Sequence, residues 1–249
     1  MIRIIPIRIS SDIKKGDDLG AIIADAAKRN NRRILDGDVM VIAQKIVSKA
    51  EGRTVDLRTV RPRSMASRLA KEQRKDPRVT EVILRESVSI VKAKNGIIIS
   101  ETRHGFVCAN AGVDQSNAEG KESAILIPAD PDRSARRLSD SIERQTGVRI
   151  AVIIADTFGR PFRNGQTNTA IGVAGIKPIK SYIGKRDMYG RKLQVTEIAV
   201  ADELASAAEL VMGKSERIPV AMVRGYGFER ASDATIRELL RPKKSDLFR

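Results

Sequence analysis

The chain has 249 residues, 41% of them hydrophobic and 3% aromatic, and its 46 Lys and Arg against 31 Asp and Glu give a formal net charge of +15. Such a chain can bury a hydrophobic core, in one large domain or in two small interlocked ones. With one cysteine and one histidine, it excludes a disulfide framework and the usual cysteine-rich or histidine-rich zinc sites.

The positive charge favours anionic partners: nucleic acid, an anionic membrane surface or phosphorylated small molecules. The scarcity of aromatic residues and the absence of Trp argue against a platform for stacking bases. No apolar run reaches the roughly 18 residues that a membrane helix needs, and residues 1–9 lack a signal-peptide pattern. We therefore expect a soluble cytoplasmic protein that binds neither nucleic acid nor membranes.

Strands and helices follow one another without a regular βαβ alternation, which predicts an α+β fold with mixed, largely antiparallel sheets. Periodicity and turn residues place the boundaries of each segment. The predicted elements are strands over 1–9, 39–43, 88–92, 96–101, 106–108, 148–154 and 218–223, and helices over about 18–33, 133–146, 196–212 and 234–240, with a charged helical pair over 61–86.

Two polar turns each carry one Asp, Asp114 in residues 110–117 and Asp156 in residues 155–165. Each turn follows an apolar run, so each carboxylate is expected just past the end of a buried strand. Rigid strand ends hold ligand-binding side chains in place, and two carboxylates suit a hard divalent cation that holds a phosphate chain. The alternative is that both are ordinary turn-forming Asp residues.

Cationic side chains accompany both features. Lys45 and Lys49, with Ser48, follow a predicted buried strand and could bind an anion, and Arg160 and Arg163 lie close to Asp156 in the sequence. Carboxylates, a metal and basic residues together are typical of phosphoryl transfer by positioning and charge neutralisation. From the residues alone we predict a metal-dependent enzyme that acts on phosphorylated substrates.

A Gly-Lys-Ser sequence at 213–215 is similar to part of a phosphate-binding P-loop. The full pattern needs a glycine where this chain has Ala208, and it needs a strand before the loop, where a helix is predicted here. We therefore predict a helix C-cap at Gly213, which leaves a phosphate contact open.

Three other features have simple interpretations. Residues 165–175 are so small that a backbone or a ligand is expected to pack closely on them. His104 is predicted to lie exposed at a hairpin tip, and Cys108 to be a small buried hydrophobic residue.

Four long blocks of the sequence, in this order, resemble the coenzyme F420:L-glutamate ligase family. The resemblance covers nearly the whole chain and ends near Arg224-Gly225. The blocks are residues 37–53, 110–117, 156–175 and 186–193.

This resemblance implies an unusual two-domain α+β fold that forms an intertwined homodimer, with a nucleotide groove at the dimer interface. It implies one unit over residues 1–249, of two interlocked subdomains, without the flavin-dependent domain that is fused to the C-terminus of some bacterial relatives. It also implies GTP-dependent addition of L-glutamate to the coenzyme precursor with Mg²⁺ or Mn²⁺, and it leaves a K⁺ requirement open.

By position, the resemblance makes Asp114 and Asp156 metal ligands, with Thr157 as an additional one. Catalytic residues are not identified; the candidates are Lys49, Arg160 and Arg163. Ala155 departs from the family, in which Ser or Thr often precedes the Asp. The residues that it places around the nucleotide are Ser10, Ser11, Asp12, Ile13, Gln44, Lys45, Lys49, Asn117, Met212, Gly213, Lys214, Ser215, Glu216 and Arg217.

The implied mechanism begins with attack of the precursor's carboxylate on the γ-phosphate of GTP, which gives an acyl phosphate. The α-amine of glutamate then displaces phosphate and forms an amide, and a second round would give a γ-linked diglutamate. Two rival interpretations are a basic nucleic-acid-binding protein and a GTP-binding regulator without catalytic activity.

Overall fold

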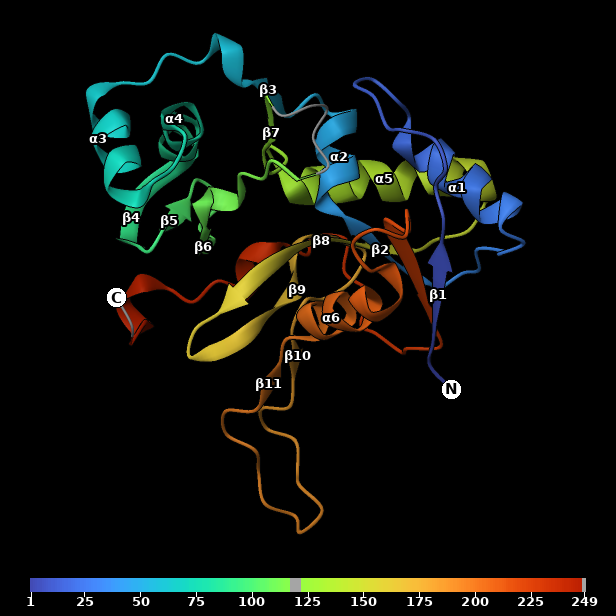
Figure 1. The fold of residues 1–249 in the computed structure, drawn as a ribbon. Coiled ribbons are helices and arrows are strands. Elements are labelled where there is room, and N and C mark those ends of the chain that lie inside the picture. The colour runs from blue at the N-terminus through green and yellow to red at the C-terminus, as the bar shows by residue number, and fades with distance from the viewer. Residues whose placement is uncertain (117–121, 248–249) are drawn as a thin grey trace.

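A larger lobe built on a five-stranded sheet carries most of the chain in the computed structural model, which describes residues 1–116 and 122–247 (Figure 1). Strands β2 and β8 are parallel and the other neighbours are antiparallel. In sheet order the strands are β1 (Arg3–Ile7), β12 (Val220–Arg224), β2 (Val39–Ala43), β8 (Ala151–Arg160) and β9 (Arg163–Ala174).

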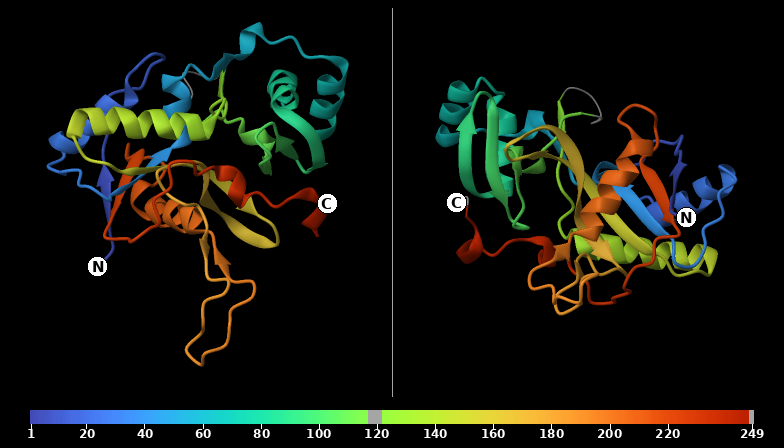
Figure 2. Two further views of the ribbon diagram at one scale, coloured as in Figure 1. Left: turned by 180° about the vertical axis from the view of Figure 1, so that it is seen from behind. Right: turned by 90° about the horizontal axis from the view of Figure 1, so that it is seen from below.

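Strand β2 is apolar along its whole length, and β8 is apolar as far as Ala155, because helices cover both faces of the sheet. Helix α5 (Pro131–Thr146), which packs on α1 (Leu19–Arg29), covers one face, and α6 (Val200–Met212) covers the other (Figure 2). Asp130 caps the start of α5 by accepting from the Arg133 amide. Gly147, in the left-handed conformation, ends the helix just after residue 146, where the predicted helix also ends.

The small-residue segment is the inner part of β9, and its close neighbour belongs to the same chain. A Cβ on Gly172 would lie 2.5 Å from the carbonyl oxygen of Pro131, at the first turn of α5. Ala174 is buried in the main core. The close packing predicted there is therefore real, but it joins a strand to a helix and does not by itself require a second subunit.

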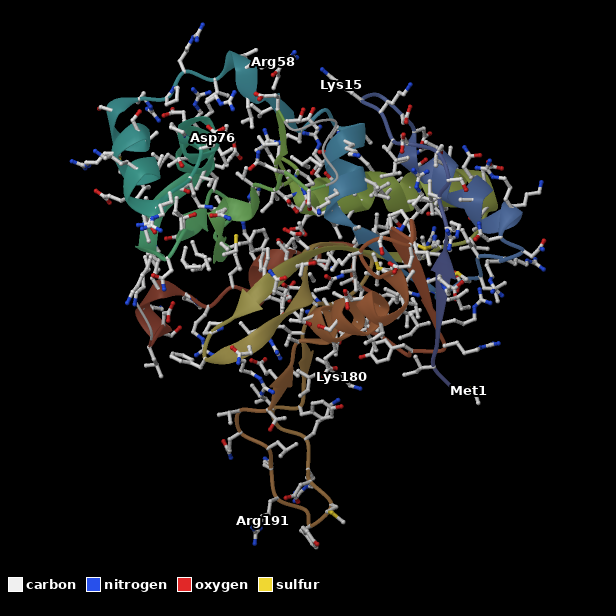
Figure 3. The ribbon with its side chains drawn as sticks, viewed as in Figure 1. Met1, Lys15, Arg58, Asp76, Lys180 and Arg191 are labelled. Atoms are coloured by element: carbon white, nitrogen blue, oxygen red, sulfur yellow. The ribbon has the colours of Figure 1, made fainter. Side chains whose placement is uncertain are left out.

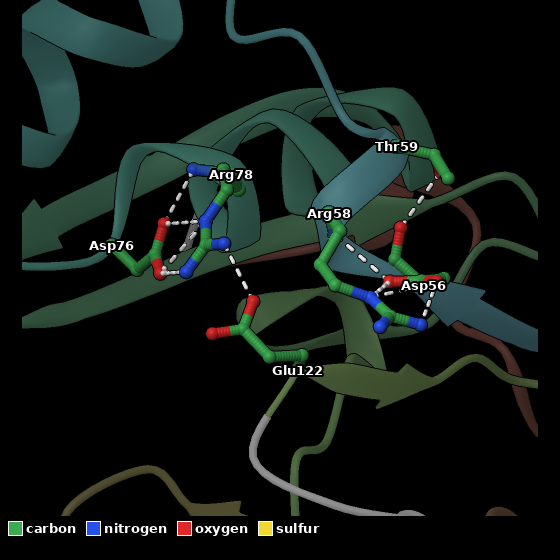
Figure 4. Close-up of polar contacts among 6 residues, drawn as sticks. All are labelled: Asp56, Arg58, Thr59, Asp76, Arg78 and Glu122. Carbon is green, nitrogen blue, oxygen red and sulfur yellow. Dashed lines mark hydrogen bonds and ion pairs between the residues drawn. The ribbon is translucent and has the colours of Figure 1, made fainter.

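The smaller lobe has its own hydrophobic core. Its elements are α3 (Ser64–Gln73), α4 (Pro77–Glu86) and a sheet of β4 (Ser87–Lys94), β5 (Ile97–Thr102) and β6 (Val107–Ala109). The helical pair predicted over 61–86 is present, and its second helix starts at Pro77 with the Asp76 carboxylate as its cap. Arg78 also bonds Glu122, at 2.6 Å, and this contact (Figure 4) ties the residue before β7 to the start of α4.

Two short pairs of strands complete the fold. β3 (Thr54–Asp56) and β7 (Ser123–Ile125) lie where the two lobes join, and beside β3 the Asp56 side chain accepts from the Arg58 amide at the start of η1 (Leu57–Thr59; Figure 4). β10 (Lys180–Ser181) and β11 (Glu197–Ile198) form the base of a projecting arm, residues 180–198 (Figures 1 and 3).

The α+β class with mostly antiparallel pairing is confirmed, while several boundaries differ from the prediction. Residues 44–50, for which no helix was predicted, form helix α2 (Gln44–Ala50). The final predicted helix is a short 3₁₀ turn, η3 (Ile236–Leu239), which starts at a capping box formed by Thr235 and Glu238. No helix in the described parts of the chain is long and apolar enough to cross a membrane.

One difference concerns the site directly. The strand expected to end at Ile154 continues to Arg160, so Asp156 lies within β8 and not beyond it. The strand continues because β9 pairs with it along its whole length, across an irregularity in register between Ile154 and Ala155. That irregularity redirects the side chains that follow it.

Candidate functional site

A cleft of about 820 Å³ brings together segments from five parts of the chain. They are the turn after β1, the start of α2, the turn after β6, the β8–β9 pair and the loop after α6. The predicted site residues that line it are Ser11, Asp12, Ile13, Gln44, Lys45, Lys49, Asp114, Asp156, Thr157, Met212, Gly213, Lys214, Ser215 and Arg217.

Five predicted residues do not belong to this set. Ser10 and Glu216 are close in sequence to lining residues but do not line the cleft. Arg160 and Arg163 lie at the exposed end of the β8–β9 hairpin, where Arg160 donates to the carbonyl oxygen of Asn164 at 2.6 Å. Asn117 lies outside the residues that the structure describes.

Asp114 is held by both its backbone and its side chain. Its N–H and C=O pair with Ile125 in an isolated β-bridge, while its carboxylate accepts from the Lys45 ammonium at 2.7 Å and from the Ser116 amide at 2.7 Å. Burial by itself would raise the pKa of Asp114, but the Lys45 and Ser116 bonds outweigh it and hold that pKa below its ordinary value. Asp114 is therefore ionised and already neutralised by a cation.

Asp156 faces the same cleft without such a partner. Its carboxylate accepts from the Thr157 amide at 2.8 Å, and it forms no ion pair within residues 1–116 and 122–247. Burial raises its pKa to about 6, and the charge of Asp114 adds to the effect. A cation beside Asp156 would therefore be stabilised by a carboxylate whose charge is unmatched.

The turn beside Asp156 has an unusual backbone. Asn110, Ala111 and Gly112 all have φ between 53° and 69°, in the left-handed region, which is costly for the first two. A Cβ on Gly112 would lie 2.4 Å from Ile127 and 3.8 Å from the Asp156 Oδ2, so only glycine fits. Asn110 lines the cleft, and its Oδ1 is buried without a hydrogen-bond partner in residues 1–116 and 122–247.

Thr157 is oriented by a residue that sequence reasoning missed. Its hydroxyl donates to the Oδ1 of Asn168 at 2.7 Å and accepts from the Lys214 ammonium at 2.8 Å. Asn168 is only 5% exposed and lies opposite Thr157 in the β8–β9 register. Since that register is a tertiary property, the only sequence signal was that Asn168 falls in the small polar stretch after Gly165.

The remaining cationic residues are placed in different ways. Lys49 lines the cleft, half-buried, and makes no ion pair with any described residue. Glu51, its possible surface partner, accepts instead from the Ser134 hydroxyl. The Gln44 side chain turns inward to donate to Ser48 and to the Leu126 carbonyl. At 213–215 the chain forms the expected helix C-cap, at Gly213.

The oxygen donors fit a divalent cation that is shared with a bound phosphate. Mg²⁺ usually takes one or two carboxylates from the protein and completes its shell with water and substrate phosphates. Asp114 and Asp156 supply two carboxylates and Thr157 a hydroxyl, and no group of three or more His, Cys, Asp or Glu in the described part of the chain forms a complete protein cage. Lys45, Lys49, Lys214 and Arg217 supply positive charge for the phosphates.

The chain is similar to known proteins of one family. Residues 7–225 match the model of the F420-0:gamma-glutamyl ligase family. The chain is 48% identical to the coenzyme F420:L-glutamate ligase of Methanothermobacter thermautotrophicus, over 94% of this chain and 93% of that protein. The protein of the same name from Methanopyrus kandleri is 45% identical, over 100% of this chain and 98% of that protein. The one from Methanocaldococcus jannaschii is 47% identical, over 87% of this chain and 86% of that protein.

Proposed function

The chain belongs to the F420-0:gamma-glutamyl ligase family, and we propose that its main cleft joins L-glutamate to a coenzyme F420 precursor at the expense of GTP. The ligase class and the F420 and glutamate substrates follow from the family and from the names of the relatives. GTP, the divalent metal and the reaction path are the parts that the chemistry of the cleft supports.

A carboxylate does not acylate an amine until its oxygen becomes a better leaving group. In the proposed path, a carboxylate oxygen of the precursor attacks the γ-phosphorus of GTP, and the bond from that phosphorus to the bridging oxygen breaks and releases GDP. The amine of glutamate then attacks the acyl carbon, loses a proton and expels inorganic phosphate. The products are an amide, GDP and inorganic phosphate.

The first step brings an anion toward a triphosphate, so positive charge must lie between them. Lys45, Lys49, Lys214 and Arg217 line one cleft and can carry this role. Asp114 and Asp156 would hold Mg²⁺ or Mn²⁺, which when bound would supply Lewis-acid neutralisation of the phosphates. The single observation that carries the proposal is that both carboxylates and three lysines meet in this cleft, from segments more than 160 residues apart.

Assembly is part of the proposal, since the resemblance implies an intertwined homodimer. The projecting arm supports it, because Met188, Tyr189 and Val195 on that arm are 87%, 80% and 84% exposed. Large apolar side chains on a protruding segment are typical of a surface that another chain covers. Light scattering at assay concentration tests whether the protein is a homodimer. A fully active monomer would contradict the homodimer without affecting the assignment of the metal ligands.

One incubation tests the activity. The protein is mixed with GTP, Mn²⁺, L-glutamate and the F420 precursor, and the products are analysed by mass spectrometry, with Asp156→Asn as the matched variant. We expect a precursor heavier by one glutamate residue, with GDP and phosphate in equal amounts. Nucleotide binding without product would instead indicate a regulator. Tight, salt-sensitive RNA or DNA binding without product would indicate a nucleic-acid-binding protein.

A further inference from the structure

A second cleft, of about 500 Å³, lies where the smaller lobe, the start of α5 and the C-terminal segment meet. Its walls include Arg103 from the β5–β6 turn, Arg136 from α5, and Asp233 and Arg237 from the segment around η3. It shares no lining residue with the main cleft. The proposed ligase chemistry gives this cavity no role.

Several other charges that line this second cleft are already satisfied. Arg53 bonds Glu86 at 2.8 Å, and Asp130 caps α5. The buried Asp132 accepts from the amides of Val173 and Ile236 and from the Thr235 hydroxyl. These bonds leave little capacity for a ligand.

Four charged side chains have no ionic partner among the described residues, although the Arg103 guanidinium donates one hydrogen bond to the carbonyl oxygen of Arg85 at 2.7 Å. Arg103, Arg136, Arg237 and Asp233 form no ion pair with any residue in 1–116 or 122–247. They bring three positive charges and one negative charge to the walls of the same cavity. A guanidinium group binds carboxylates well because its N–H donors match their geometry, while the Asp233 carboxylate disfavours a plain anion and favours one that carries an ammonium group.

His104, in the same wall, has an unused ring nitrogen. Its Nε2 lies 3.1 Å from the carbonyl oxygen of Ala129, which can only accept, so Nε2 carries the proton. The other nitrogen, Nδ1, is buried and has no hydrogen-bond partner among the residues that the structure describes. His104 stacks on Phe106, whose ring meets the edge of Phe158 in the lining of the main cleft. Three rings thus connect the walls of the two clefts.

We propose that the second cleft binds a small amino dicarboxylate, with its two carboxylates toward the arginines and its ammonium toward Asp233. L-Glutamate has these three groups, and its choice among amino dicarboxylates rests on the proposed function. Free phosphate fits less well, because it offers nothing to Asp233 and is repelled by that carboxylate. Glutarate, which is glutamate without the amine, separates the contribution of Asp233 from that of the arginines.

Equilibrium dialysis with labelled L-glutamate, without nucleotide, metal or precursor, tests the proposal. Loss of one guanidinium bond in Arg136→Gln or Arg237→Gln should weaken glutamate binding about tenfold. Arg133→Gln, an exposed residue on the same helix outside the cleft, should leave the affinity unchanged. Asp233→Asn should weaken binding of glutamate but not of glutarate. Circular dichroism melts check that each variant is folded.

Three outcomes would overturn the proposal: no glutamate binding, unchanged affinity in the Arg136→Gln/Arg237→Gln double variant, or displacement of glutamate by excess GTP or by equimolar phosphate. Because the dialysis contains neither GTP nor precursor, it is independent of the ligase assay. A protein that binds glutamate here but makes no product keeps this inference and loses the proposed function. A protein that makes product but binds no glutamate in the dialysis contradicts this inference and supports the proposed function.

Discussion

The turn that carries Asp114 and the strand that carries Asp156 face one cleft with opposite electrostatics. On the turn, Lys45 and Ser116 bond the carboxylate and keep its pKa low. On β8, the carboxylate has one backbone donor and forms no ion pair with a described residue, and burial raises its pKa to about 6 although the charges of Lys45 and Lys214 oppose the shift. The cleft therefore combines a neutralised ligand with an unmatched one, and the unmatched one has more to gain from a bound cation.

The largest expected effect is that of Asp156→Asn on turnover. An amide holds a divalent cation far less well than a carboxylate, and altering even the partners of metal ligands costs about 10–100-fold. We therefore expect a loss of more than about a hundredfold, measured as GDP release at limiting Mn²⁺. Near-normal turnover under that condition would remove Asp156 from the metal site.

Asp114→Asn should also lose activity, and it sharpens the comparison because it frees Lys45. If both carboxylates hold one cation, the double variant should be little worse than either single variant. Titration of Mn²⁺ by calorimetry should show the same pattern. Losses that multiply would instead place the two side chains in separate sites.

The raised pKa of Asp156 predicts a dependence of stability on pH in metal-free protein. Folding raises this pKa from 3.8 to about 6. The contribution of the neutral Asp156 acid to the free energy of unfolding is therefore fully present below pH 3.8 and is lost as the pH rises through about 6. Asp156→Asn, always neutral, should then raise the free energy of unfolding by roughly 1–3 kcal/mol above pH 6 and change it little near pH 4.

Urea unfolding with a chelator, over this pH range, measures the difference. The matched control is Asp114→Asn, which lacks this gain because the wild-type carboxylate is stabilised by Lys45. An Asp156→Asn variant that is less stable than the wild type at alkaline pH would contradict an unmatched charge on β8.

Lys49→Ala should weaken the binding of GTP without affecting Asp114 or Asp156. Lys49 lines the cleft and has no ion pair among the described residues, so its ammonium is available to a phosphate. We expect the dissociation constant for GTP to rise about tenfold in calorimetry. Lys28→Ala, on α1 and outside the cleft, should leave the dissociation constant for GTP unchanged. Equal GTP affinities in the two variants would show that Lys49 does not bind the nucleotide.

The smallest effect concerns Cys108, which lies behind Asp156. Burial raises the pKa of its thiol to about 12, and the Asp156 charge adds to this. The thiolate is the reactive form, so iodoacetamide should label this single thiol only after unfolding, as mass spectrometry would show. In Asp156→Asn the native thiol should react slightly faster. Rapid labelling of the folded wild type would contradict its burial.

The parts of the site that could be predicted are those set by local sequence. Asp114 and Asp156 were recognisable because each follows an apolar run, and Lys45 and Lys49 because they directly follow β2. The helix start at Pro77 and the stop at Gly147 have local capping signals for the same reason.

The missed parts depend on register and on long-range packing. Asn168 reaches Thr157 only because β9 folds back on β8 with that particular pairing. The same pairing carries Arg160 and Arg163 away from Asp156 toward the hairpin end. The second cleft draws its arginines from four separated segments, and no local pattern indicates that they meet.

The place of β12 within the sheet has a consequence for synthesis. This strand, formed by residues 220–224, lies between β1 and β2, which come from the first fifth of the chain. Until the ribosome has made residue 224, the two early strands lack their common neighbour and expose unpaired edges, which are prone to join other chains. Pairings between such distant residues also make folding slow. Cells that make this protein therefore face a long interval in which a chaperone is most useful, and fragments that stop before Val220 should aggregate.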